Sequence, residues 1–410
     1  MRKGLEAQVL VLVTLALLAF GLVMVYSATS APAAVGDSDP GYYVKRQALA
    51  AVVGLALLAA AARVPFQTWR RLAPVLLVAS AALLVAVLLV AEPINGARRW
   101  IEAGPATFQP SEFAKLGLAT WAAAYLARAR PPRTLAELAR PLGLVAAVFC
   151  ALLLLEPDLG TAIAMTGMLG AMLLVSGTPL RTLALGGSVA VVLGLAAIWA
   201  EPYRRARIFA FLNPWDDAQG AGFQTVQAMI GLGSGGILGV GIGEGVQKVF
   251  YLPEAHTDMI FAIIGEEVGL VGTAALMAAY VAFAHAGFNI ALRCRDPFGK
   301  RLAAGLTVLV CGQAALNLAA VMGLAPLTGI PLPFVSYGGS SLVVALASVG
   351  VLLNIAGQDA RSTAARVPDR RRGDGRPRAA GPRRGGVAAK PRRAGDLRRV
   401  AGAGRGTPRP

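Results

Sequence analysis

Long apolar stretches separated by short polar segments make up most of the first 360 residues of this 410-residue chain. About 20 apolar residues cross a bilayer as one helix, and by that measure the chain has ten predicted spans. They cover residues 9–27, 47–62, 73–91, 111–127, 141–156, 161–178, 183–200, 259–283, 302–321 and 341–357. The first follows two basic residues as a signal peptide does, but it is as apolar as the later ones and is interpreted as a retained helix. The pattern predicts an all-α polytopic membrane protein.

Two connections differ from simple loops. Residues 201–258, between the seventh and eighth spans, contain NPWDDAQGAGFQTVQ and GLGSGGILGVGIGEG, and their aromatic residues predict an ordered segment with short interfacial or re-entrant helices. Between the ninth and tenth spans, GLAPLTGIPLPFVSYGGSSL is rich in Pro and Gly. Irregular backbone at membrane depth needs protein or a water-filled cavity to satisfy its polar groups. A rigid connector is the alternative for this second segment.

Composition excludes an ordinary soluble enzyme, because 56% of the residues are hydrophobic and only 15% are charged. The net charge of +17 is concentrated in the last fifty residues, which hold 16 basic and 3 acidic side chains. We therefore expect a membrane domain over 1–360 and a disordered basic cytoplasmic tail over 361–410 that lies near anionic lipid. The basic charge describes this tail, and the chain is not expected to bind nucleic acid.

The distribution of charge predicts which side each segment faces. With the N-terminus inside, 30 of the 39 Lys and Arg residues fall in inner segments, and the positive-inside rule places both termini in the cytoplasm. Fifteen of the 22 carboxylates then fall on or near the outer side, where we expect the chemistry. An odd number of cysteines, two of them in apolar runs, excludes a disulfide framework. Two histidines are too few for a His-rich zinc site.

Cations predicted on the outer side run against this bias. They include Arg98, Arg99, Lys115, Arg204, Arg205, Arg207 and Lys248. An anionic ligand such as a pyrophosphate would explain them, since guanidinium groups bind phosphate oxygens as bidentate forks and a lysine supplies a point charge. Headgroup contacts and local ion pairs are the alternative, which the residues alone favour.

Ionisable residues also mark the starts of two predicted helices. In QPSEFAKL, Ser111 is a predicted N-cap, while Glu112 and Lys115 share one helix face as a salt bridge or as a pair facing a wet cavity. In YLPEAHTDMIFAIIGEE, Asp258 either caps the helix or carries chemistry. Glu266 lies about 12 Å deeper at 1.5 Å per residue, and we expect it to be a buried acid facing a cavity.

Six motifs, in this order and spacing, resemble the SEDS family of shape, elongation, division and sporulation proteins. They are NGARRWI, QPSEFAKL, EPDLGT, NPWDDAQGAGFQ, YLPEAHTDMIFAIIGEE and PLTGIPLPFVSYGGSSL. The resemblance covers residues 1–360, and QKVFYLPEAHTD is closer to the division branch. It implies a ten-helix peptidoglycan glycosyltransferase that polymerises lipid II on the outer face of the plasma membrane, at the division septum. It also implies a class B penicillin-binding protein transpeptidase and other division proteins as partners.

The resemblance further implies that Asp258 is catalytic and that Glu112 and Lys115 line a membrane cavity. Asp258 would act as base on the acceptor hydroxyl. Lys115 and outer arginines, with or without Mg²⁺ or Mn²⁺, would stabilise the leaving undecaprenyl pyrophosphate, and a single carboxylate suits an inverting displacement. The candidate substrate-binding residues are Glu112, Lys115, Arg98, Arg99, Glu156, Asp158, Arg207, Lys248, His256, Glu266 and Ser336. Met259 departs from the Phe expected at its position.

Three alternatives stay open. A lipid II flippase is one, because paired acidic and basic residues inside a bundle suit a transporter equally well. A flippase would need polar groups at both leaflets, whereas the candidates cluster in the outer half. A polymerase of the elongation branch is the second. The third, a scaffold for division proteins, leaves the outer ionisable groups unexplained.

Overall fold

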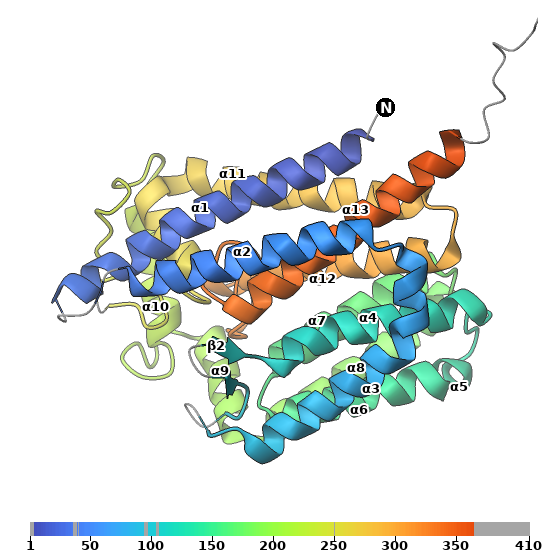
Figure 1. Cartoon of the computed structure of the whole chain (residues 1–410). Helices are drawn as coiled ribbons and strands as arrows, with labels where there is room; N and C mark the ends of the chain where they lie inside the picture. The colour runs from blue at the N-terminus through green and yellow to red at the C-terminus, as the bar shows by residue number, and fades with distance from the viewer. Residues whose placement is uncertain are drawn as a thin grey trace, which may run out of the picture. The chain divides into compact units, whose positions relative to one another are not determined.

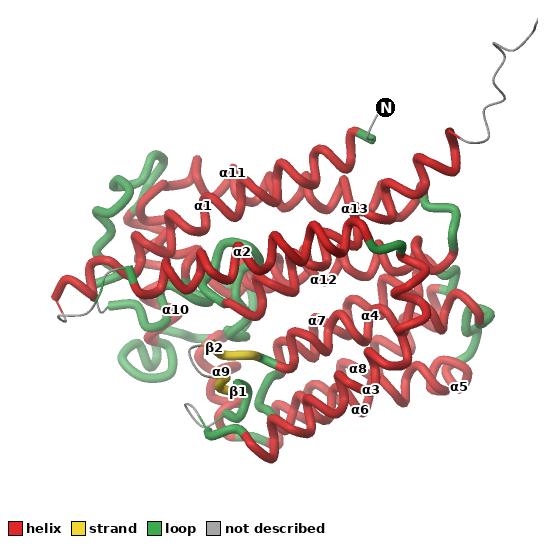
Figure 2. The backbone as a smooth tube through the Cα atoms, viewed as in Figure 1, coloured by secondary structure: helices red, strands yellow, loops and turns green. Residues whose placement is uncertain are grey.

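The computed structural model describes residues 4–35, 39, 41–93, 97–103, 106–249 and 251–364 as a helical membrane domain (Figures 1 and 2). The helices are α1 (Leu5–Val35), α2 (Tyr42–Arg63), α3 (Phe66–Val90), α4 (Pro110–Arg128), α5 (Leu135–Leu138), α6 (Leu144–Leu155), α7 (Leu159–Val175), α8 (Leu180–Ala200), α9 (Pro202–Leu212), α10 (Phe223–Ser234), α11 (Ile260–Arg293), α12 (Pro297–Val321) and α13 (Gly339–Ala364), and a π-helical turn η1 (Ala139–Gly143) joins α5 to α6. Strands β1 (Ile101–Ala103) and β2 (Ala106–Phe108) form a short antiparallel hairpin.

Each of the ten apolar stretches predicted to be a span coincides with a helix of the structure. Within the described ranges, eight helical segments are long and apolar enough to cross a membrane: α1, α2, α3, residues 135–155, α8, α11, α12 and α13. The two others are α7, which has 17 residues, and α4, which carries Glu112 and Lys115. The prediction of a mostly helical protein with several spans is confirmed.

The helices differ sharply in how much of their surface the protein covers. α12 and α13 are largely buried, and α12 packs against α7, α4 and α11. α8 buries a single side chain, Thr182, and exposes its Leu and Val residues, as expected for a helix that faces lipid on nearly every side. The length of an apolar run therefore says little about how much of the helix the protein buries.

The described residues of the connection between α8 and α11 include two short helices, α9 and α10, as predicted. After α10, the glycine-rich chain docks against a break in α11 at Gly269, where φ is +69°. The Val240 amide donates to the Glu266 carbonyl oxygen at 3.0 Å, and the Leu270 amide donates to that of Gly236 at 2.9 Å. A Cβ on Gly269 would stand 2.3 Å from the Gly239 nitrogen, so only glycine permits this approach.

Protein groups hold the irregular connection between α12 and α13. The Asn317 amide donates to the carbonyl oxygens of Asp258 and Ile330, at 2.7 and 2.8 Å. Gln47 of α2 donates to the Ser336 carbonyl oxygen at 2.9 Å. The expectation that surrounding protein satisfies this backbone is confirmed.

The C-terminal helix is longer than predicted. α13 continues to Ala364, whereas the predicted span ends at residue 357. The helix therefore enters the segment assigned to the basic tail, most of which (365–410) lies outside the described residues.

Candidate functional site

Asp258 lies in the turn before α11, and its side chain does not cap that helix. The N-cap residue is Met259, and no side chain accepts a capping hydrogen bond there. The Asp258 carboxylate accepts a hydrogen bond from the Thr257 hydroxyl at 3.3 Å, and one of its oxygens stands 4.0 Å from the position of a Cβ on Gly329. The helix-cap interpretation of Asp258 is wrong, and its carboxylate is available for chemistry.

The surroundings of Asp258 shift its ionisation toward neutral pH. The pKa of the Asp258 carboxyl is raised to about 6: burial is the main cause, the Arg207 guanidinium lowers the pKa, and the Glu254 carboxylate raises it. Arg207 is held in place by donating to the Leu327 carbonyl oxygen at 2.9 Å and by lying 4.9 Å from the Tyr203 ring centroid. A carboxyl with this pKa is suited to accept a proton near neutral pH.

A second group of polar side chains lies where α4 and α7 begin. The Lys115 Nζ is 2.7 Å from a Glu112 carboxylate oxygen, and both side chains are buried, so the prediction that they share a face is confirmed. Asp158 caps α7 by accepting from the Thr161 amide at 3.0 Å. Ser111 is not the N-cap of α4: the helix starts at Pro110 after Gln109, and the Ser111 hydroxyl instead donates to Asp158 at 3.4 Å.

The chain between α12 and α13 connects these two groups. A Cβ on Gly160, in the first turn of α7, would stand 3.0 Å from the Thr328 carbonyl oxygen and 2.7 Å from the Ile330 side chain. Gly329 lies between Thr328 and Ile330 in the chain and faces the Asp258 carboxylate. Asp258 and the α4–α7 group therefore belong to one region at the same end of the bundle.

The arginines that were predicted on the outer side mostly bind backbone carbonyls at the C-terminal ends of helices. Arg98 donates to the Leu88 carbonyl oxygen of α3 at 3.0 Å, and Arg99 donates to those of Glu156 and Pro157, just after α6. Arg204 likewise reaches carbonyl oxygens near the ends of α6 and α8. A cation there complements the negative end of the helix dipole. Local structural contacts thus occupy these groups.

Glu156 is the most unusual carboxyl of the region. Its side chain is fully buried, and among the described residues neither carboxyl oxygen has a hydrogen-bond partner. The pKa of the Glu156 carboxyl is raised to about 8: burial is the main cause, neighbouring Asp158 also raises the pKa, and Arg99 lowers it. The group is therefore mainly protonated at neutral pH.

Comparison with known proteins assigns this architecture to a family. The model of the FtsW, RodA and SpoVE proteins, described as "Cell cycle protein", matches residues 7–361. The chain belongs to the FtsW/RodA/SpoVE family. A protein from Geobacter sulfurreducens named "Probable peptidoglycan glycosyltransferase FtsW" is 40% identical over 350 residues, covering 85% of this chain and 94% of the relative.

Solved structures of family members share the fold. The RodA protein of Thermus thermophilus superposes with a TM-score of 0.64 at 31% identity, covering 85% of this chain and 96% of RodA. A chain from a structure titled "Structural coordination of polymerization and crosslinking by a peptidoglycan synthase complex" gives a TM-score of 0.72 at 32% identity, covering 85% and 97%. The family resemblance seen in the six motifs is confirmed.

Lys248 and Glu266, which were predicted to bind substrate, anchor the long connection between α8 and α11. Lys248 is buried and pairs with Glu267 at 2.6 Å, while also donating to the Ser27 hydroxyl of α1 at 3.1 Å. Glu266 accepts hydrogen bonds from the amides of Val246 and Gln247, at 2.9 and 3.1 Å. The expectation that Glu266 is a buried acid is confirmed, and its carboxylate binds the loop backbone. Glu267, which sequence reasoning left without a role, completes the anchor.

A backbone hydrogen bond places His256 beside the turn that contains Ser336. The Tyr337 amide donates to the His256 carbonyl oxygen at 2.9 Å, and the His256 ring centroid lies 4.5 Å from that of Tyr43 and 5.5 Å from that of Tyr337. Burial lowers the pKa of His256, which keeps the ring neutral. The Ser336 hydroxyl accepts from the Leu332 amide within its own turn. Tyr43 comes from α2, and no sequence signal pointed to it.

Proposed function

We propose that this protein is a peptidoglycan glycosyltransferase that polymerises lipid II on the outer face of the bacterial plasma membrane. The observation that carries the proposal is the carboxylate of Asp258, which lies just before the kinked helix α11 without capping it. It has a pKa of about 6 and is influenced by the charge of Arg207. The printed name of the Geobacter relative supports the same activity. That name also favours the division branch and a place at the septum.

In the proposed reaction, Asp258 takes the proton of the acceptor sugar hydroxyl as that oxygen attacks the anomeric carbon of the donor. The bond between this carbon and the undecaprenyl pyrophosphate breaks, with inversion of configuration. Arg207 lies close enough to Asp258 to affect its ionisation and adds positive charge near the departing phosphates. Lys115, paired with Glu112, supplies a second cation on the substrate path.

A divalent cation, Mg²⁺ or Mn²⁺, stays part of the proposal. Within the described residues, no group of three or more His, Cys, Asp or Glu side chains is placed to hold a metal ion. Mg²⁺ commonly binds one or two carboxylates together with substrate phosphates. Asp258 with neighbouring Glu254 fits that second arrangement, in which the cation would offset pyrophosphate charge.

The proposed topology has ten spans and cytoplasmic termini. α4 and α7 are the ninth and tenth proposed spans. α4 offsets its two buried charges by pairing them, and α7 is apolar over nearly its whole length. This arrangement puts residues 201–258 and Asp258 outside. It also leaves the basic tail on the inner side, near anionic lipid.

The proposed partners are a class B penicillin-binding protein transpeptidase and other division proteins. The matching structure whose title couples polymerisation with crosslinking supports a crosslinking partner. Such a partner would join the glycan strands that this chain makes.

The test is polymerisation of labelled lipid II by the purified protein, with and without a class B penicillin-binding protein, followed on gels. Asp258→Asn should abolish glycan chains, because it keeps the shape and removes the base. Asp216→Asn, at an exposed acid of the same connection, is the matched control and should keep full activity. Normal polymerisation by the Asp258 variant would contradict the proposal, and lipid II translocation without polymerisation would favour the flippase.

A further inference from the structure

A cavity of about 430 Å³ lies between the first turns of α3 and the last turn of α4, far from Asp258. Arg70, Arg71 and Arg128 line it, and no Asp or Glu does. Trp121 and Tyr125 form one wall, with their rings stacked at 5.6 Å and 11°. The opening of this cavity is therefore strongly cationic, and one wall is aromatic.

The positive charge of this cavity is not neutralised by the protein. Within the described chain, the three guanidinium groups have no ion-pair or hydrogen-bond partner. The N-terminus of α3 has no acidic residue in its first turn and no capping side chain, so its dipole adds positive potential beside Arg70 and Arg71. Both features favour an anion.

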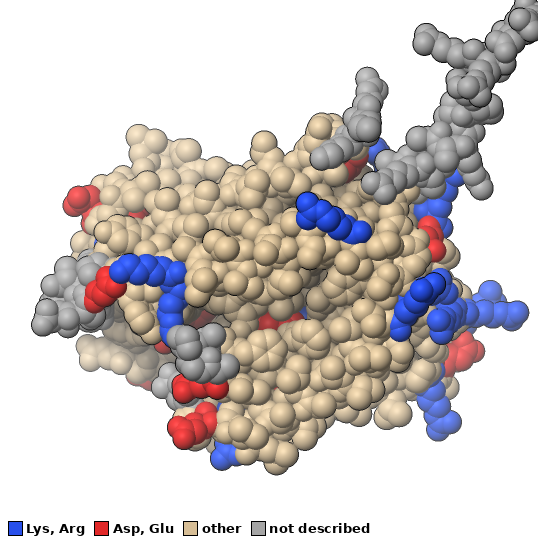
Figure 3. All heavy atoms as spheres, viewed as in Figure 1, with Lys and Arg blue, Asp and Glu red and all other residues tan. Residues whose placement is uncertain are grey.

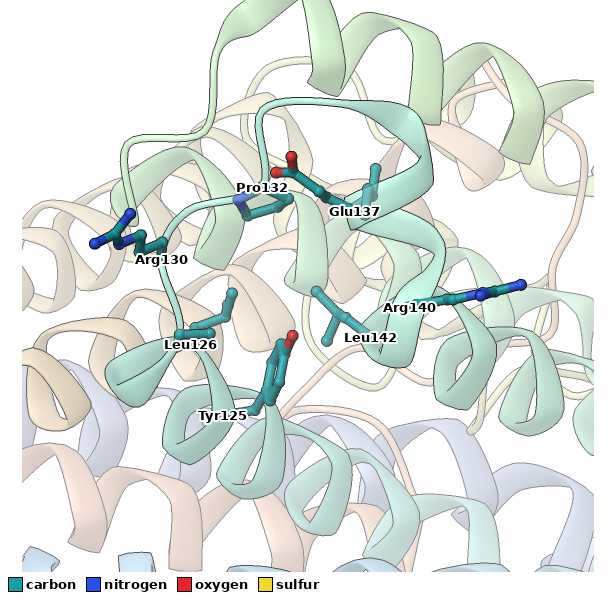
Figure 4. Close-up of a pocket in the computed structure, with 9 residues that line it drawn as sticks. Tyr125, Leu126, Arg130, Pro132, Glu137, Arg140 and Leu142 are labelled. Atoms are coloured by element: carbon teal, nitrogen blue, oxygen red, sulfur yellow. The ribbon is translucent and has the colours of Figure 1, made fainter.

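A neighbouring cavity of about 230 Å³ shares Tyr125 and Ala129 with the first but has a different character. Glu137 lines it, and in Figure 4 the side chains of Arg130 and Arg140 extend to opposite sides, away from the space between Leu126 and Leu142. The larger cavity is therefore the better place for an anion.

The cavity lies at the end of the bundle opposite the glycosyltransferase site. Along α4, Ser111 and Arg128 are separated by about 25 Å at 1.5 Å per residue. Figure 3 shows Lys and Arg side chains gathered at this end, around the start of α3 and α5. In the topology proposed above, this end meets the inner leaflet, where anionic phospholipids accumulate.

We propose that the cavity binds the phosphate headgroup of an anionic phospholipid of the inner leaflet. The three arginines would hold the phosphate oxygens as charge-assisted forks. In the proposed topology, the stacked Trp121 and Tyr125 would lie at the boundary between headgroup and acyl chain, where aromatic side chains are enriched. Pro74 also lines the cavity and has no N–H to donate to the Arg70 carbonyl oxygen, which can accept a hydroxyl of a glycerol headgroup.

The test uses the full chain in phosphatidylcholine vesicles that contain phosphatidylglycerol with brominated acyl chains. Brominated phosphatidylglycerol should quench tryptophan fluorescence more than brominated phosphatidylcholine at the same content, and Trp121→Phe should remove the difference. Arg70→Gln/Arg71→Gln/Arg128→Gln should weaken the apparent affinity about 100-fold, from about 1 kcal/mol per arginine. A triple Lys variant keeps the charge but loses the forks, so it should recover only part of the affinity.

The matched control is Arg181→Gln/Arg295→Gln/Lys300→Gln. It removes the same charge from the same end of the bundle, outside the cavity, and should leave the difference in quenching intact. Equal loss in both triple variants would overturn the proposal in favour of a diffuse surface charge. Inorganic phosphate distinguishes the sources: full competition at millimolar concentration would identify a free-phosphate site, and displacement only by an acidic peptide would identify a protein partner. None of these outcomes depends on lipid II polymerisation.

Discussion

At the scale of single residues, the ionisation of Asp258 sets the pH range of the proposed chemistry. Burial raises its pKa to about 6, so the base is protonated and inactive below that value. The polymerisation rate should fall about tenfold per pH unit below 6 and level off above it. Arg207→Met should move this inflection to higher pH, because the guanidinium lowers the pKa. Initial rates across the pH range test this, and a profile flat through pH 6 in both proteins would contradict it.

Substitutions in the Glu112–Lys115 pair can show whether its role is structural or functional. Lys115→Met and Glu112→Gln should each lower polymerisation strongly, with Lys115 acting mainly on the lipid II KM, because a charge-assisted contact to phosphate is lost. Each variant should also lose about 3–5 kcal/mol of stability, since it leaves a buried charge unpaired. Normal turnover combined with a lower melting temperature would show that the pair only stabilises α4.

Glu156 should make stability depend on pH in an unusual direction. Its pKa rises from 4.5 to about 8 on folding, so the folded protein binds the proton more tightly, and stability falls as pH rises between these values. Glu156→Gln stays neutral and should be more stable by about 2 kcal/mol or more at pH 8, with little difference at pH 4. Thermal unfolding in detergent at both pH values measures this. Glu137→Gln, at an exposed acid, is the matched control.

At the scale of elements, the break in α11 is where the long connection docks, shortly after Asp258. Gly269→Ala should destabilise the protein by about 2 kcal/mol or more, because alanine resists a φ of +69° and its Cβ would overlap the Gly239 backbone. Polymerisation should fall with it, as the docked segment leads directly to Asp258.

Gly170→Ala in α7 is the matched control for this substitution. Its backbone is helical, and an added Cβ meets nothing within 4 Å. We expect it to be neutral or stabilising by about 0.5–1 kcal/mol. Equal melting temperatures for the two variants would show that the break does not require glycine.

At the scale of the whole molecule, the basic tail and the catalytic region are separable. Truncation after Ala364, where α13 ends, should leave polymerisation of lipid II in vitro unchanged. It should weaken binding to anionic vesicles by about 1 kcal/mol per Lys or Arg that lies near the surface. A truncated protein that folds but cannot polymerise would mean that the tail acts on the helical domain itself.

The sequence by itself determined the helical segments and the local pairs within them. All ten apolar runs became helices, because a bilayer-length stretch must satisfy its backbone hydrogen bonds internally. The contact between Glu112 and Lys115 followed from their spacing, since residues three apart share a helix face.

Tertiary structure decided the roles that depend on distant partners. Lys248 pairs with Ser27, 221 residues away, and Arg99 binds a carbonyl 57 residues away, so neither role was legible in local spacing. The ionisation of Asp258 likewise depends on burial and on Arg207 from another element. Charges and apolar groups interact only over short distances in space. Which residues far apart in the sequence come that close is decided only when the helices pack.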